Sequence, residues 1–420
     1  MAKSQVPTAN CQPPNPTTER ATKLRSGRCP RLPTCRAQSL EPCLPAAGRR
    51  QPLHPVPCPA ALLPLLAGSL PETTKERVQC RVEMASQLPR VCVTGGGGFI
   101  ASWLVELLLG RGYAVHATLR DPCDPKNAHL KQLDGAPENL HLFKADVLDC
   151  ETLTPAVQGC QGVFHLATPV PEDKILHPDL DVLDPAVKGT LNVLKVCSTL
   201  KVHKVVVMSS NAAVTSNPNW PQDRIKDESC WSDTEFCKEK EDWYSLAKTL
   251  AEQEALEYAS NNGLNVVTLC PPFVFGPLLQ SSVNTSSKLL IYVIKGGPDV
   301  MTNRMWEIVD VRDVADALLL LYEKNQSSGR YICSPNRVCT RDLVDLLKKM
   351  YPEYDYVNNV VDADHAGPPL SSQKLRDLGW EPRKLESTLS DSVQSYEKAG
   401  LLQDVPGNPC RLPFVIRAWL

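Results

Sequence analysis

The sequence predicts an α/β fold with a doubly wound parallel sheet and a smaller C-terminal lobe. Three observations lead to this prediction. From residue 90 onward, short apolar runs rich in β-branched residues alternate with helical stretches. Such runs between helices are typical of a parallel sheet that is covered on both faces. A glycine-rich turn follows the first run, and the alternation gives way to a different pattern after Pro277.

Residues 1–83 differ in composition from the rest of the chain. They hold 14 of the 37 prolines and carry a net charge of +7, so the remainder carries −9. A Pro- and Arg-rich segment of this kind buries too little apolar surface to offset its ordering entropy, and we expect it to be disordered. It is either an upstream extension before Met84 or an organellar transit peptide. The first reading predicts a cytoplasmic protein, and the second an organellar one.

The composition also argues against several kinds of function. The acidic body offers no basic face for a nucleic acid. The longest apolar run, AALLPLLAGSL, is too short for a membrane span and contains Pro64. The 17 cysteines include no Cys-x-x-Cys pair, so we expect free thiols rather than a zinc site or a disulfide framework. The sequence thus predicts no nucleic-acid partner, no membrane and no metal, and it leaves the oligomeric state open.

The expected strands and helices follow one another in regular order. Strands are predicted at 90–94, 114–120, 140–146, 162–167, 204–210 and 265–272. The intervening helices begin at Phe99, cover 127–133 and 152–159, end near Leu200, and surround Tyr244. This order predicts a Rossmann-type dinucleotide-binding domain over 84–276. Helical stretches and short strands such as GRYICSP then predict a lobe over 277–420 that binds substrate and adds the final elements of the sheet.

The stretch VTGGGGFIASW joins the first strand to the first helix. It places Gly95, Gly98 and Ala101 at a G-x-x-G-x-x-A spacing. The glycines allow a tight turn and a close backbone approach, and the helix N-terminus then faces a pyrophosphate. This context predicts dinucleotide binding, and a merely tight turn is the alternative.

The ends of the next strands indicate which dinucleotide is bound. The second strand ends at Arg120, and Lys126 follows, where an NAD site usually has an acidic residue. Two cations suit a 2′-phosphate and favour NADP(H), although Asp121 is placed to pair with Arg120 instead. Asp146, after the third strand, either accepts a hydrogen bond from the adenine amino group or caps the following turn. The end of the fourth strand, Ala167-Thr168, is expected to run beneath the cofactor.

The stretch DWYSLAK carries the candidate chemistry. Tyr244 and Lys248 lie one helical turn apart on the helix after the fifth strand, which ends in Ser209-Ser210. A carbonyl that accepts hydride must gain a proton, and a tyrosine donates it if its pKa falls toward neutrality. A neighbouring ammonium and an oxidised nicotinamide favour the phenolate, and a serine hydroxyl stabilises the developing oxyanion. The alternative is a partly buried tyrosine beside a solvated lysine.

The linked motifs resemble a known family. VTGGGGFIASW, VFHLATPV, DWYSLAK and PPFVFGPLLQ are similar to those of the extended short-chain dehydrogenase/reductases, and within them to the plant cinnamoyl-CoA reductase and dihydroflavonol reductase family. The resemblance covers residues 84 to about 410. It implies a catalytic triad of Ser210, Tyr244 and Lys248, with Ser210 rather than Ser209 at the serine position. It implies NADP contacts at Gly95, Gly98, Phe99, Ile100, Arg120, Lys126, Asp146, Val147, Ala167, Thr168, Tyr244, Lys248, Pro271, Val274 and Ser286.

Three functions follow from these features. The first is an NADPH-dependent reductase of an aromatic, phenylpropanoid-type aldehyde, ketone or CoA thioester, as in lignin biosynthesis. Cinnamoyl-CoA reductases read Asn-Trp-Tyr-Cys-Tyr-Gly-Lys where this chain reads DWYSLAK, so carbonyl and thioester substrates both stay open. The second is an NAD-dependent sugar-nucleotide epimerase or dehydratase, against which Arg120 and Lys126 count. The third is a non-catalytic NADPH sensor, in which Tyr244 and Lys248 would typically be eroded.

Several other features have structural explanations. The cluster Asp310–Asp313 is expected to be a helix cap with an ion pair. His165 is expected to be a satisfied core residue, and Cys230 and Cys237 to be loop thiols. The segment before the tyrosine contains Trp220, Trp231 and Trp243. These tryptophans are expected either to line an aromatic pocket or to pack internally.

Overall fold

The main sheet contains seven parallel strands in the order β10-β6-β5-β4-β1-β2-β3. The computed structural model describes residues 88–168, 175–362, 367–404, 410–413 and 416–417. The strands are β1 (Arg90–Thr94), β2 (Ala114–Leu119), β3 (Leu140–Lys144), β4 (Gly162–His165), β5 (Lys204–Met208), β6 (Val266–Cys270) and β10 (Gly329–Ile332). The six expected strands are confirmed, although most end a few residues early. The motif GRYICSP supplies the seventh strand, which pairs with β6 at the edge of the sheet.

Both faces of the sheet's central strands are buried, which explains why these strands are mostly apolar. In β5, Val206 and Met208 join one core cluster, whereas Val205 and Val207 join another on the opposite face. Successive side chains of a strand point to opposite faces, so a strand between two helical layers needs apolar residues at every position.

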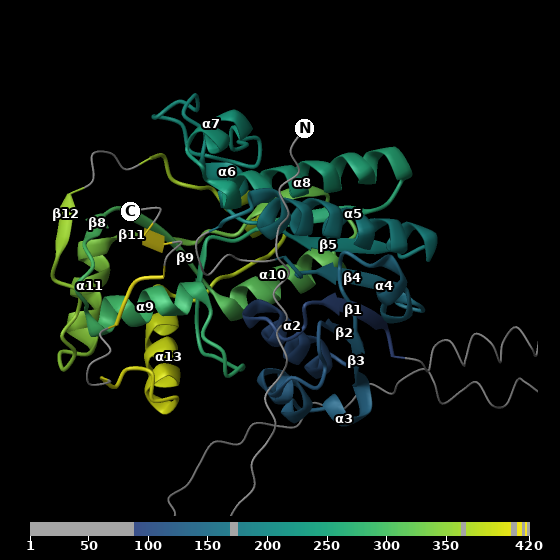
Figure 1. Cartoon of the computed structure of the whole chain (residues 1–420), viewed down its shortest axis with the longest axis horizontal. Coiled ribbons are helices and arrows are strands. Elements are labelled where there is room, and N and C mark those ends of the chain that lie inside the picture. The colour runs from purple at the N-terminus through teal and green to yellow at the C-terminus, as the bar shows by residue number, and fades with distance from the viewer. Residues whose placement is uncertain (1–87, 169–174, 363–366, 405–409, 414–415, 418–420) are drawn as a thin grey trace, which may run out of the picture. The chain divides into compact units, whose positions relative to one another are not determined.

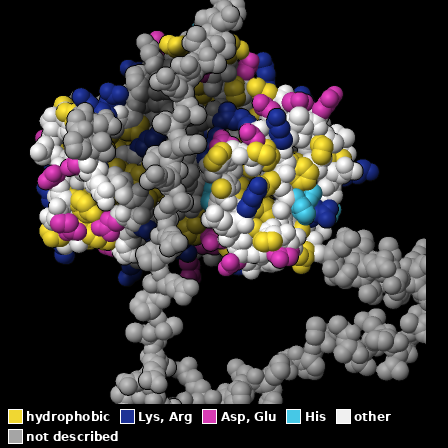
Figure 2. Space-filling model, turned by 60° about the horizontal axis from the view of Figure 1, so that its bottom comes forward, with side chains coloured by type: hydrophobic (Ala, Val, Ile, Leu, Met, Phe, Trp, Pro, Cys, Tyr) yellow, Lys and Arg dark blue, Asp and Glu magenta, His cyan; other side chains and the backbone are white. Residues whose placement is uncertain are grey.

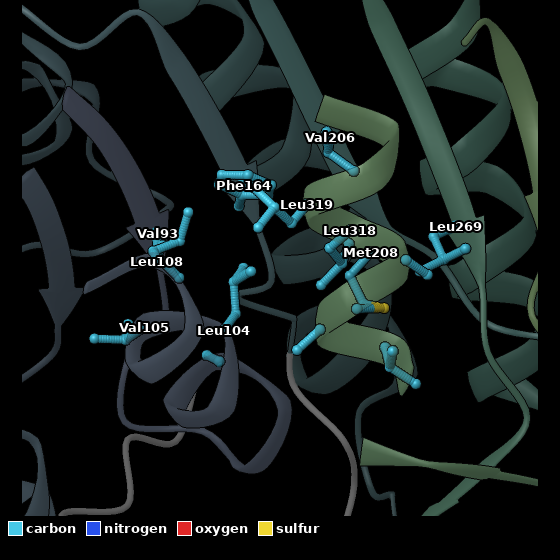
Figure 3. Close-up of a cluster of buried hydrophobic side chains, with 14 of the residues drawn as sticks. Val93, Leu104, Val105, Leu108, Phe164, Val206, Met208, Leu269, Leu318 and Leu319 are labelled. Carbon is cyan, nitrogen blue, oxygen red and sulfur yellow. The ribbon is translucent and has the colours of Figure 1, made fainter. Parts of the chain in front are cut away.

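Helices from distant parts of the chain form the two outer layers. The first face is covered by α2 (Phe99–Gly110) and α10 (Val311–Glu323), which pack against each other and the sheet. Figure 3 shows Leu104 and Leu108 of α2 beside the strands, with Leu318 and Leu319 of α10 facing β4 and β5. The other face is covered by α4 (Cys150–Val157), α5 (Asp184–Thr199) and α8 (Trp243–Asn262). The doubly wound architecture is therefore confirmed.

Two connections differ from the expected helices. The stretch predicted as a helix at 127–133 is a 3₁₀ segment, η2 (Pro125–Gln132), in which Asp124 accepts a hydrogen bond from the Lys126 backbone. The helix that ends near Leu200 is preceded by a π-helical turn, η3 (Asp179–Leu183). Four short helices complete the connections: α3 (Ala136–Asn139), α6 (Ala212–Thr215), α7 (Thr234–Glu239) and α12 (Gln373–Arg376).

Most elements from β7 (Phe273–Phe275) onward, apart from α10, β10 and α12, form a lobe at one end of the sheet (Figure 1). They include α9 (Thr285–Lys295), α11 (Thr340–Met350) and α13 (Leu385–Lys398). They also include two small sheets, built from β7, β9 (Met305–Asp310) and β11 (Asn336–Cys339), and from β8 (Met301–Asn303) and β12 (Val360–Asp362). A separate core of large side chains, among them Tyr292, Trp306 and Tyr396, holds this lobe together.

Figure 2 shows one face of the protein on which Lys and Arg side chains are interspersed with Asp and Glu. On the described residues of that face, the Lys and Arg side chains do not form a continuous strip. In the part of the chain that the structure describes, no helix has both the length and the apolar character needed to cross a bilayer.

Candidate active site

The glycine turn between β1 and α2 has the geometry of an anion-binding loop. Gly95 has φ +69°, and the Gly98 N–H donates to the Gly95 carbonyl at 2.9 Å. Gly98 is the N-cap of α2 and forms no side-chain cap, so the N–H groups of the first turn, at Phe99 and Ile100, face outward at the positive end of the helix dipole. A Cβ on Gly97 would lie 2.1 Å from Asn127 Oδ1, so any larger residue there must displace the Asn127 side chain. The turn fits a pyrophosphate.

The end of β4 lies against this turn. Thr94 Oγ1 accepts hydrogen bonds from the backbone N–H groups of Leu166 and Ala167, both at 3.1 Å. A Cβ on Gly95 would lie 3.1 Å from the Ala167 Cα, so the two segments are in close contact. The structure thus brings Gly95, Ala167 and Thr168 to one edge of the sheet.

The expected 2′-phosphate cations follow β2. Arg120 is exposed at the strand end. Within the described residues Asp121 forms no ion pair with it, and the Asp121 carboxylate instead accepts a hydrogen bond from the Cys123 backbone at 2.9 Å. Lys126 pairs with Asp124 at 2.8 Å, and hydrogen bonds from Lys126 lower the pKa of that carboxyl. Of the two cations, Arg120 is therefore the one that is more available to bind a 2′-phosphate.

Asp146 and Val147 lie just beyond β3. Asp146 Oδ1 accepts a hydrogen bond from the Leu148 backbone at 2.9 Å, so the capping alternative is found. Its other carboxylate oxygen points to no partner within the described residues, and the adenine contact stays a prediction. Val147 packs beneath α5, because a Cβ on Gly189 would lie 2.8 Å from its side chain.

Tyr244 and Lys248 project from the first two turns of α8. Asp242 caps this helix by accepting a hydrogen bond from the Ser245 backbone at 3.1 Å. The Tyr244 hydroxyl is hydrogen-bonded to the Ser210 side chain. Lys248 is 5% exposed, and its ammonium lies 6.0 Å from the centre of the Tyr244 ring. The structure therefore brings the three predicted catalytic residues together, and Lys248 is buried rather than solvated.

The two serines after β5 point to different partners. Ser210 contacts Tyr244, whereas Ser209 Oγ donates to the buried Glu252 carboxylate at 2.7 Å. Of these two serines, Ser210 is the one that faces Tyr244.

Burial dominates the electrostatics of this pair. It raises the pKa of Tyr244, and the hydrogen bond from Ser210 offsets part of that rise. It lowers the pKa of Lys248 to about 8, against the opposing charge of Glu252. The fall in the tyrosine pKa that the chemistry requires is therefore not present in the chain alone, because desolvation outweighs the Ser210 hydrogen bond and the charge of Asp242 adds to the rise.

The remaining predicted cofactor residues lie on β6, β7 and α9. The Asn211 N–H donates to the Pro271 carbonyl at 2.9 Å, which places the end of β6 beside Ser210. Val274 is buried in β7, and Ser286 lies in the first turn of α9.

A further polar residue of this region was not predicted. Gln280 is 4% exposed, and neither atom of its amide has a partner within the described residues. Its loop reaches α2, because Trp103 Nε1 donates to the Pro277 carbonyl at 2.9 Å. Buried amides are normally satisfied, so Gln280 offers a donor and an acceptor to a ligand or water. The feature of the sequence that could have identified Gln280 is its place at the end of the motif PPFVFGPLLQ.

Two of the structural explanations are confirmed. His165 is hydrogen-bonded to Thr94 at 2.9 Å and to Thr190 at 3.1 Å in the core. Asp310 caps α10 and pairs with Arg312, which also binds Asp391 of α13 at 2.6 Å.

The interpretation of Cys230 and Cys237 as loop thiols is wrong in part. Both are fully buried, and Cys237 lies within α7. Of the tryptophans, Trp231 packs internally, with the Arg330 guanidinium 3.3 Å from its ring centre.

Comparison with known proteins agrees with this geometry. The sequence profile of the NAD dependent epimerase/dehydratase family matches residues 91–333. The chain belongs to this family. Cinnamoyl-CoA reductase 1 of Petunia hybrida is 44% identical over 315 residues, which cover 74% of this chain and 93% of that protein.

Solved structures of reductases share the fold. Vestitone reductase from alfalfa (Medicago sativa) has a TM-score of 0.66 at 33% identity, over 74% of this chain and 99% of that chain. The Gre2–NADPH complex from Candida albicans has a TM-score of 0.65 at 28% identity, with the same coverage. Within the family, this member of the extended short-chain dehydrogenase/reductases is therefore an oxidoreductase of the cinnamoyl-CoA reductase-like group, which uses a nicotinamide cofactor.

Proposed function

We propose that this enzyme uses NADPH to reduce an aromatic, phenylpropanoid-type carbonyl compound or CoA thioester, with Tyr244 as the proton donor. The observation that carries the proposal is the contact between the Tyr244 and Ser210 hydroxyls, with the Lys248 ammonium behind them. This group lies at the carboxyl edge of the parallel sheet, where ligands of such folds bind.

Each residue has a defined part in the reaction. Bound NADPH would supply the hydride for the carbonyl carbon. The Ser210 and Tyr244 hydroxyls hold the carbonyl oxygen, and Tyr244 gives it a proton as negative charge develops. Lys248 stabilises the phenolate that remains, because its ammonium is buried and its field is weakly screened.

The preference for NADPH rests on the end of β2. Arg120 is exposed and without an acidic partner among the described residues, so its planar fork is available for a 2′-phosphate. The glycine turn and the open first turn of α2 would hold the pyrophosphate, with Gly95, Gly98, Phe99 and Ile100. Lys126, Asp146, Val147, Ala167, Thr168, Pro271, Val274 and Ser286 complete the proposed cofactor site.

The substrate class rests on the relatives. One is named for a cinnamoyl-CoA thioester and another for vestitone. The proposal therefore includes both a thioester and a ketone of aromatic type.

The test is to incubate the full-length protein with NADPH and a panel of cinnamoyl-CoA esters, hydroxycinnamaldehydes, phenylacetaldehyde and dihydroflavonols, following nicotinamide absorbance. We expect oxidation that requires one of these compounds and disappears in Tyr244→Phe. A parallel incubation with NAD and a sugar nucleotide tests the alternative, and turnover there without net change of the cofactor would support an epimerase or dehydratase instead. NADPH binding without turnover of any panel member would refute the substrate assignment.

A further inference from the structure

A fully buried carboxylate lies on the same face of α8 as the tyrosine and the lysine. Glu252 follows Lys248 by one helical turn, as Lys248 follows Tyr244, and its side chain is 1% exposed. Its Oε2 accepts a hydrogen bond from Ser209 Oγ at 2.7 Å, and its Oε1 accepts one from Thr268 Oγ1 at 2.5 Å. The carboxylate therefore joins α8 to the end of β5 and to β6.

The edge strand of the sheet supplies its counter-ion. Arg330 of β10 donates from Nε to Glu252 Oε1 at 2.9 Å and from Nη2 to Oε2 at 3.3 Å. The same guanidinium donates to the carbonyls of Cys230 at 2.8 Å and Ala213 at 3.2 Å, and it stacks on Trp231. One buried ion pair thus connects β10, α6 and the loop before α7 to the catalytic helix.

Stability alone explains this pair poorly. Removing two charges from water is unfavourable, and apolar residues of similar volume often replace a buried ion pair without loss of stability. The hydroxyl donors and backbone acceptors around Glu252 and Arg330 fix both side chains in one arrangement. That arrangement lies directly behind Lys248 rather than elsewhere in the core.

The charge of Glu252 has few competitors near Lys248. The other titratable groups that face this lysine are Tyr244 on its own helix, His165 of β4 and Cys270 of β6. Burial lowers the pKa of His165 to about 3 and raises that of Cys270, so both are neutral at pH 7. Glu252 is therefore the anion that acts on the Lys248 ammonium within the described residues.

We infer that Glu252, held by Arg330, is a positioning residue of this reductase. It fixes α8 against the strand ends so that Tyr244 stays aligned with Ser210, and its negative charge keeps Lys248 in the ammonium form. This role rests on the proposed function, because it concerns the same proton-donating group.

Two opposite charge changes test the inference in the full-length protein. Glu252→Gln removes the anion, so we expect the alkaline limb of the kcat profile to move to lower pH by roughly one unit. Arg330→Gln leaves Glu252 to interact with Lys248 alone, so the limb is expected to move to higher pH. Glu257→Gln, an exposed change on the same helix, is the matched control and is expected to leave the profile unmoved.

A merely structural role would lower activity in both variants without moving the limb, and that result would overturn the inference. Circular dichroism and NADPH binding establish that each variant is folded. If one of the two single variants fails to fold, the other carries the test alone, because each is expected to move the limb in its own direction. An unmoved limb in the folded variant would overturn the inference.

A second readout separates this inference from the proposed function. NMR of protein labelled with ¹³C at the lysine Cε, with the signal assigned by Lys248→Met, follows the titration of Lys248 without any substrate. A shift in Glu252→Gln without turnover of any panel substrate by the wild type would refute only the proposed function. Turnover with an unmoved Lys248 titration would refute only the positioning role.

Discussion

The Lys248 ammonium lies 6.0 Å from the centre of the Tyr244 ring and donates a hydrogen bond to the Met208 carbonyl at 3.4 Å. The lysine is thus fixed between the catalytic helix and the end of β5. Because it is buried, its pKa falls from the ordinary 10.5 to about 8. Its protonation therefore changes within an accessible pH range, and this makes both activity and stability depend on pH.

Activity and stability are expected to change in opposite directions between about pH 8 and pH 10.5. Above about pH 8 the folded enzyme loses the Lys248 proton, so reduction is expected to slow. In the same window the unfolded chain still holds that proton, so the lysine's contribution to the free energy of unfolding rises with pH. Lys248→Met is therefore expected to abolish turnover and to stabilise the protein at pH 7 by on the order of 2 kcal/mol. Rate profiles and urea unfolding at pH 7 and pH 9.5 measure both effects, and a destabilised Lys248→Met protein would contradict this account.

The two serines after β5 are expected to separate catalysis from stability. Ser210→Ala removes the partner of Tyr244, so we expect kcat to fall by about 10²-fold with little change in unfolding free energy. Ser209→Ala removes a buried donor from Glu252, which is expected to lower the unfolding free energy by about 1–3 kcal/mol, with the smaller loss in kcat. Steady-state rates and urea unfolding compare the two variants directly. The reverse ranking of the two kcat values would show that Ser209 is the catalytic serine.

Arg120 is expected to decide the choice between the two nicotinamide cofactors. Arg120→Gln removes the exposed guanidinium at the end of β2, so the Kd for NADPH is expected to rise by about 10- to 100-fold. The Kd for NADH is expected to change little, because that cofactor has no 2′-phosphate. Fluorescence titration with both cofactors measures the difference. An equal loss for both would assign Arg120 a structural role.

Two glycines of the same helix region provide a matched test of the turn. A Cβ at Gly97 would lie 2.1 Å from Asn127 Oδ1, whereas a Cβ at Gly110 meets nothing within 4 Å. Asn127 is buried and donates to the Asp121 carbonyl at 2.9 Å, so its displacement loosens the segment that follows Arg120. Gly97→Ala is expected to weaken NADPH binding about tenfold, measured by titration. Gly110→Ala is expected to leave binding unchanged and to stabilise the protein by about 0.5–1 kcal/mol. Equal NADPH affinities would contradict this account of the turn.

Local patterns in the sequence were sufficient for the elements and for much of the candidate site. Apolar runs predicted β1, β2, β4, β5 and β6, because both faces of these strands are buried, whereas the edge strand β3 has no fully buried residue. The glycine spacing predicted the turn, since its conformation depends on a few adjacent residues. The spacing of Tyr244 and Lys248 placed both on one face of a helix, which follows from helix geometry alone.

Contacts between distant residues were decided only by the tertiary structure. The strand GRYICSP resembles any short apolar run, and its place beside β6 depends on how the whole sheet is assembled. The residues themselves gave no reason to separate Ser209 from Ser210, which the fold turns toward Glu252 and Tyr244 respectively. Arg330 meets Glu252 across 78 positions of the chain. Such a pair produces no periodic pattern in the sequence from which it could be predicted. Its geometry comes from the packing of β10 against β6 and not from either segment alone.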